Sequence, residues 1–71
     1  MIYIEWIDSS SVDGWVFTED FEPKLQTVES VGFIVHENEE MITISSHRAP
    51  NLVHSPFTIP KIAIIRRYSL Q

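Results

Sequence analysis

The sequence contains no cysteine among its 71 residues, which excludes disulfides and thiolate metal sites. It has two glycines and four prolines, too few for a flexible linker, so we expect a single domain over residues 1–71. No apolar run approaches the ~20 residues that a membrane helix requires, and Met1-Ile2-Tyr3 has no basic signal region. These absences favour a cytoplasmic protein that makes no membrane contact. A domain this small has only marginal stability unless other contacts help it.

Acidic residues are absent from the second part of the chain. All ten lie within residues 1–40, where Lys24 is the sole base, whereas residues 41–71 hold the other four bases and no acid. Two interpretations are open. The two parts interleave in the fold and partly neutralise each other, or the acidic part forms a face that repels nucleic acid and attracts a basic partner.

Residues 31–46 are the most informative stretch and predict a β-hairpin. Two runs rich in β-branched and aromatic residues flank a polar turn, which we place at Asn38 and Glu39. This register puts apolar side chains opposite each other on one face, namely Val35 with Ile42 and Phe33 with Ile44. Gly32 within a strand predicts a bulge or a tight bend.

The remaining chain is predicted as short strands and loops. Ile2–Ile7 alternates as a strand that places Ile2, Ile4 and Trp6 on one face. A long irregular loop follows over residues 8–26, with a short extended piece at residues 14–17 and one helical turn at Thr18-Glu19-Asp20. Further along the chain we expect a loop over residues 47–56, a strand over 57–59, a tight turn at Pro60-Lys61 and a last strand over 62–70.

Five short strands have few ways to bury two faces, and a strongly bent sheet that closes on itself is the economical one. The predicted fold is therefore all-β, with at most one short helical turn. Its predicted core consists of Ile4, Trp6, Phe33, Val35, Ile42, Ile44 and Ile64.

The order of these elements resembles an SH3-like or Sm-like five-stranded barrel. The matching features are the long loop after strand one, the central bent hairpin and the proline turn before the last strand. Several short motifs also resemble small uncharacterised proteins encoded by phages and prophages: Glu5-Trp6-Ile7-Asp8-Ser9, Gly14-Trp15, residues 30–35 and Ile59-Pro60-Lys61. This resemblance implies a small accessory protein of the host cytoplasm, and no catalytic residue comes with it.

Candidate chemistry is sparse. His47 and His54 bracket one loop and could approach each other, but a metal site needs two or three imidazoles on one rigid surface, and we expect capping or exposed roles. Ser9, Ser10 and Ser11 have no histidine nearby in sequence, which indicates turn chemistry rather than nucleophilic catalysis. We therefore expect no enzyme activity, no cofactor and no metal.

Binding is the function that the sequence favours. The leading hypothesis is a non-catalytic module that binds a host or self protein through an acidic loop with aromatic anchors: Asp8, Asp13, Trp15, Glu19, Asp20, Phe21 and Glu22. For Trp15 two roles are open, a contact with the partner and a plug of the barrel under the loop. The alternative is an Sm-like oligomer that holds RNA or a nucleotide through Arg48, Lys61, Arg66, Arg67 and Tyr68. The net charge of −5 disfavours this alternative. Self-association is expected in either case, because Ile62–Leu70 offers more apolar surface than one core needs.

Overall fold

A computed structural model of the chain describes residues 1–9, 14–22 and 24–71. These residues form an all-β structure, which confirms the predicted class. The strands are β1 (Ile2–Ser9), β2 (Leu25–Glu37), β3 (Met41–Ser45), β4 (His47–Ala49), β5 (Leu52–His54), β6 (Phe57–Pro60) and β7 (Ile64–Ser69). Two 3-10 turns, η1 (Thr18–Asp20) and η2 (Lys61–Ala63), interrupt them, which is one more helical turn than predicted.

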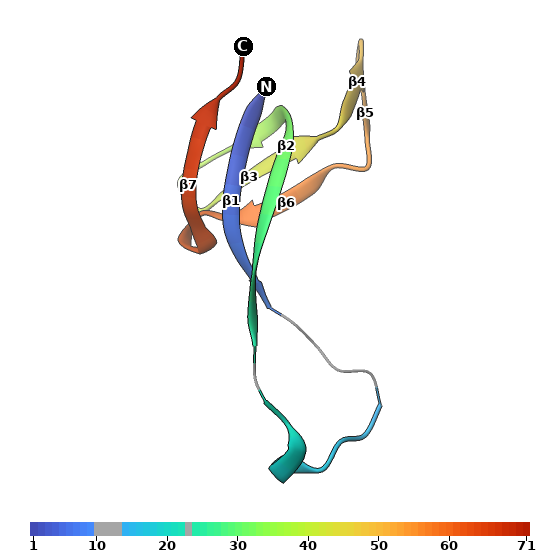
Figure 1. Cartoon of the computed structure of the whole chain (residues 1–71). Coiled ribbons are helices and arrows are strands. Elements are labelled where there is room, and N and C mark those ends of the chain that lie inside the picture. The colour runs from blue at the N-terminus through green and yellow to red at the C-terminus, as the bar shows by residue number, and fades with distance from the viewer. Residues whose placement is uncertain (10–13, 23) are drawn as a thin grey trace.

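Five strands form one antiparallel sheet in the order β6-β3-β2-β1-β7. The long strand β2 belongs to both halves of this sheet, because its first part pairs with β1 and its last part pairs with β3. The two edge strands, β6 and β7, are consecutive in sequence and are joined by η2. Figure 1 shows the β7-β1-β2 half in front of the β3-β6 half, so the sheet is strongly bent. The space between the halves holds the core.

Gly32 lies where β2 changes its partner. It is opposite Ile2 of β1, and the next residue, Phe33, is opposite Ser45 of β3. A Cβ atom at position 32 would lie 2.8 Å from the Ser45 carbonyl oxygen and 3.3 Å from the Ile44 Cβ. The backbones of β2 and β3 approach too closely here for any side chain, which is the physical reason for glycine.

The predicted hairpin is confirmed, but its register is wrong. Ile34 lies opposite Ile44 and Glu37 opposite Ile42, with a shift between Ile34 and His36. This shift is a β-bulge, and the extra residue in β2 reverses the alternation of its side chains. Val35, which we predicted in the core, is consequently 41% exposed.

The turn of this hairpin is held by one side chain. The Asn38 Oδ1 accepts hydrogen bonds from the backbone N–H groups of Glu40, at 2.8 Å, and Met41, at 2.9 Å. The Asn38 N–H donates to the Met41 carbonyl oxygen at 3.0 Å. Asparagine thus closes a turn that includes Glu40 and is one residue longer than predicted.

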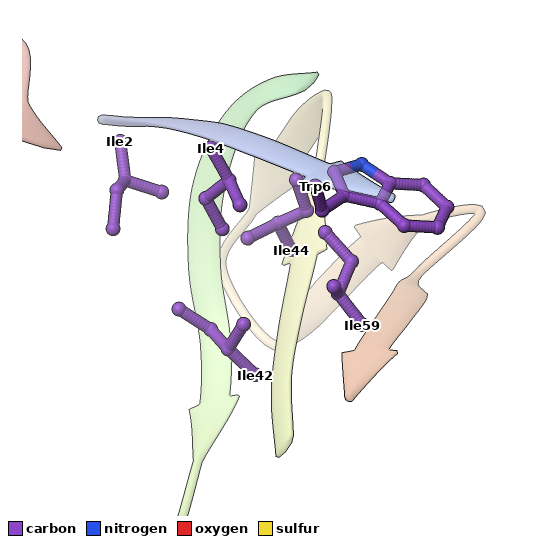
Figure 2. Close-up of a cluster of buried hydrophobic side chains, with 6 residues drawn as sticks. All are labelled: Ile2, Ile4, Trp6, Ile42, Ile44 and Ile59. Atoms are coloured by element: carbon purple, nitrogen blue, oxygen red, sulfur yellow. The ribbon is translucent and has the colours of Figure 1, made fainter. Parts of the chain in front are cut away.

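The hydrophobic core lies between the two halves of the sheet (Figure 2). Ile4, Trp6, Ile42 and Ile44 are buried as predicted, and Ile64 packs against them while partly buried. Phe33 is half-buried. The core also includes Ile2 and Ile59, which the prediction missed. The indole Nε1 of Trp6 donates to the Ser30 Oγ at 3.0 Å, so the indole N–H has a hydrogen-bond partner although the ring is buried.

The predicted loop over residues 47–56 is instead a second hairpin, β4–β5, that projects from the sheet in Figure 1. Its turn uses a positive φ of 67° at Asn51, a conformation that asparagine tolerates. Buried Ser45 fixes its base, because the Ser45 Oγ lies 2.7 Å from the His47 carbonyl oxygen and 2.6 Å from that of His54. Residues 14–17, predicted as a short extended piece, belong to no strand, and Phe17 among them has an extended backbone with φ −66° and ψ 133°.

No helix in the described part of the chain is long and apolar enough to cross a bilayer.

Candidate interaction site

The loop between β1 and β2 lies away from the core. Strands β1 and β2 continue together as a two-stranded ribbon, with Ile7 opposite Thr27 and Asp8 opposite Gln26. Residues 14–22 lie beyond the end of this ribbon, at one extreme of a molecule that measures 50 × 23 × 21 Å (Figure 1). We call residues 14–22 the acidic aromatic loop.

Large apolar side chains of this loop face solvent. Trp15 is 104% exposed and Phe17 is 75% exposed, and Val16 and Phe21 are exposed as well. Trp15, Val16 and Phe17 line a shallow open hollow together with Asp20. Since monomeric proteins rarely expose clustered aromatic residues without a use for them, this part of the surface is suited to a contact.

The backbone of the loop is organised by η1. The Asp20 N–H donates to the Phe17 carbonyl oxygen at 2.9 Å, and the Phe21 N–H donates to the Thr18 carbonyl oxygen at 3.3 Å. This turn places Glu19 and Asp20 beside the exposed Phe17. The predicted helical turn at residues 18–20 is therefore confirmed, as a 3-10 turn.

The structure brings most of the predicted interaction residues into one segment. Trp15, Glu19, Asp20, Phe21 and Glu22 are all exposed in the loop. Asp8 lies apart from them, half-buried in β1 at the base of the loop. Asp13 falls outside the described residues.

The basic residues of the alternative site lie among carboxylates. The Glu37 carboxylate accepts from the two terminal guanidinium nitrogens of Arg67, Nη1 at 2.6 Å and Nη2 at 3.3 Å, and pairs with the Lys61 Nζ at 2.7 Å. Hydrogen bonds from Arg67 and Lys61 lower the pKa of Glu37 to about 2, and the Glu37 hydrogen bond raises the pKa of Arg67. This triad links the end of β2 to η2 and β7.

A further ion pair and a stacked pair of tyrosine rings lie on the outer face of β1 and β7. The Arg66 Nε is 3.0 Å from the Glu5 carboxylate, and the Tyr68 ring stacks on Tyr3 with centroids 4.7 Å apart. Desolvation raises the pKa of Tyr3, and the carboxylates of Glu29 and Glu5 add to the rise. Three of the four bases after residue 40 thus pair with acids from the first 40 residues, as the first interpretation of the charge asymmetry predicted.

Arg48 is separate from the other bases. It lies in β4, with its guanidinium carbon 4.3 Å from the centroid of the Phe33 ring. An apolar groove runs beside this contact, between β2 and the β4–β5 hairpin; we call it the β4–β5 groove. It is lined by Phe33, Ile34, Val35, Arg48, Ala49, Asn51, Leu52 and Val53. The sequence did not predict this groove, because it predicts a loop over residues 47–56 where the structure has a hairpin.

His47 and His54 do approach each other, as their positions suggested. They are cross-strand partners in the β4–β5 hairpin, with ring centroids 5.6 Å apart and planes at 82°. The His47 Nδ1 lies 2.9 Å from the Ser46 Oγ. Within residues 1–9, 14–22 and 24–71, no cluster of three or more histidine or acidic side chains is arranged to hold a metal ion.

Comparison with family models, with curated protein sequences and with solved structures finds no match to this chain.

Proposed function

We propose that the chain is a non-catalytic interaction module that binds a protein partner through the acidic aromatic loop. The single observation behind this proposal is the complete exposure of Trp15 beside exposed Phe17. Tryptophan is enriched among the residues that dominate interface energies, because it buries a large area at small entropic cost. A loop that places this side chain in water, away from the core, is arranged for contact.

The charges of the loop indicate the chemistry of its partner. Glu19, Asp20 and Glu22 flank the aromatic residues, and residues 14–22 contain no base. Carboxylates around an apolar centre steer a basic partner towards the site and speed association. The partner surface that fits is therefore an apolar hollow with basic residues near it.

The proposal includes an SH3-like or Sm-like barrel of the phage accessory type as the scaffold. The sheet order β6-β3-β2-β1-β7 supports it, as does the 3-10 turn that joins the two edge strands. The ion triad of Glu37, Lys61 and Arg67 adds a side-chain link between β2, η2 and β7. Such a scaffold would hold the loop at one end and leave it free to bind.

The alternative, an Sm-like oligomer that holds RNA or a nucleotide, has weaker support. Lys61, Arg66 and Arg67 are engaged with carboxylates, and Arg48 lies over Phe33. Phosphate binding at these bases would have to compete with Glu37 and Glu5. Retention on heparin at moderate salt would favour this alternative over the protein-binding one.

A comparison of three baits tests the proposed function. Wild type, Trp15→Ala and Ile62→Ala are immobilised, and host proteins retained on each are identified by mass spectrometry. Ile62 is 98% exposed in η2, so Ile62→Ala removes apolar surface away from the loop. We expect a partner that wild type and Ile62→Ala retain and Trp15→Ala loses, with about 30-fold weaker binding for the loop variant.

One outcome would contradict the proposed function. If the partner binds Trp15→Ala as tightly as wild type while both proteins are folded, the loop is not the contact surface. A charge-reversed variant, Glu19→Lys with Asp20→Lys, separates affinity from steering. It should slow association and flatten its salt dependence.

A further inference from the structure

Two of the exposed apolar surfaces in the described part of the chain have opposite electrostatic character. One is the acidic aromatic loop, whose Trp15, Phe17 and Phe21 are exposed. The other is the β4–β5 groove, where Leu52 is 70% exposed and Val53 is also exposed. One surface is a protrusion and the other is concave.

The chemistry of the groove is the counterpart of the chemistry of the loop. Its lining residues include no acid, and its one charged side chain is Arg48. The hairpin around it adds His47 and His54, and residues 41–71 contain no acid at all. Residues 14–22 contain three acids and no base. An apolar centre beside a cation therefore matches an aromatic centre with an anionic rim.

The acidic aromatic loop and the β4–β5 groove of one copy of the chain do not contact each other. The long axis of the molecule is 50 Å, and Figure 1 shows the loop at the end opposite the β4–β5 hairpin. Contact between the two surfaces within one chain would require the sheet to unfold. Contact between two copies requires no change in either.

We propose that the β4–β5 groove binds the acidic aromatic loop of a second copy of this chain. This inference rests on the proposed function, since it uses the same loop and names its partner. Trp15 of one copy enters the groove beside Leu52 and Val53 of the next, and Glu19 or Asp20 approaches Arg48. Such a contact joins two different surfaces, so it is heterologous, and copies continue head to tail into a ring or an open chain.

Mixing two single-defect variants tests this inference. Trp15→Ala has a defective loop and an intact groove, whereas Leu52→Asp has an intact loop and a negatively charged groove. By light scattering, wild type should grow beyond a dimer with rising concentration, and each variant alone should stay monomeric. An equimolar mixture should form a 1:1 heterodimer and nothing larger, because only one productive contact remains.

Controls keep the test independent of folding. Leu25→Asp introduces the same charge at an exposed leucine of β2 outside both surfaces, and it should assemble like wild type. Arg48→Glu is a second groove variant, which tests the same surface if Leu52→Asp does not fold. The Trp15→Ala and Arg48→Glu proteins should also form the heterodimer when mixed, and circular dichroism should show that every variant retains its strands.

Three outcomes would overturn the inference. Wild type could stay monomeric up to millimolar concentration, either groove variant could assemble like wild type, or the mixture could fail to form a heterodimer. A monomeric wild type that still retains a host protein through Trp15 would refute the second copy as partner and leave the proposed function intact. A chain that neither assembles nor retains a partner through Trp15 would refute both.

Discussion

The two tryptophans of this chain lie nine positions apart in sequence and in opposite environments. Trp6 is 7% exposed within the core, and Trp15 is 104% exposed in the loop. Trp6 alternates with Ile2 and Ile4 in a strand that is paired on both sides. Trp15 lies beyond the end of the β1–β2 ribbon, where neither half of the sheet reaches it. In this chain the tryptophan of the paired strand is buried and stabilises the fold, whereas the tryptophan beyond the paired strands lies in solvent.

The largest expected effect comes from the buried side of this comparison. Ile4→Ala should lower the free energy of unfolding by about 2–5 kcal/mol, because Ile4 is fully buried and its truncation leaves a cavity. Ile62→Ala is the matched control, since Ile62 is 98% exposed, and it should change stability by less than about 0.5 kcal/mol. Urea denaturation measures both. Equal losses of unfolding free energy in the two variants would contradict the placement of Ile4 in the core.

A smaller effect is expected where β2 changes its partner. Gly32→Ala adds a Cβ atom 2.8 Å from the Ser45 carbonyl oxygen, so β2 and β3 must move apart, at a cost of about 1–3 kcal/mol. Gly14→Ala tests the loop in parallel. Its Cβ would meet nothing within 4 Å, and only its φ of 80° opposes it, at about 1 kcal/mol. Thermal unfolding should rank Gly32→Ala as the less stable variant, and the reverse ranking would contradict the close approach of the strands.

The Glu37 triad should appear as a dependence of stability on pH. The folded state lowers the pKa of Glu37 from 4.5 to about 2, so the triad stabilises the fold above pH 4.5. That contribution is lost as the pH falls from about 4.5 towards about 2. Glu37→Gln removes this titration, and its free energy of unfolding should fall less steeply than that of wild type over the same range.

Glu39→Gln is the control for this pH experiment, because Glu39 is an exposed carboxylate in the turn of the same hairpin. We expect it to keep the wild-type slope in urea titrations between pH 2 and 6. A Glu37→Gln slope equal to that of wild type would show that the triad does not persist in solution.

Much of the fold could be predicted from sequence, because buried residues alternate with more exposed ones at Ile2, Ile4 and Trp6 of β1 and at Ile42 and Ile44 of β3. The bulge at Val35 could not, since it depends on how β2 meets β3 in space. The β4–β5 hairpin has two strands of three exposed residues each, too short for any periodicity to appear. The contents of the loop and the neutralisation of late bases by early acids could be predicted from sequence. The individual ion-pair partners could not, because Glu37 and Arg67 are 30 residues apart.

Acrylamide quenching of the two tryptophans, one at a time, tests the central claim most directly. Trp6→Phe leaves Trp15 as the sole tryptophan, and Trp15→Phe leaves Trp6. In dilute protein, where copies are separate, Trp15 should emit at long wavelength and be quenched as readily as free tryptophan, while Trp6 should be blue-shifted and shielded. A blue-shifted, shielded Trp15 in the dilute, folded protein would contradict the account, because the loop would then cover the core rather than offer a contact.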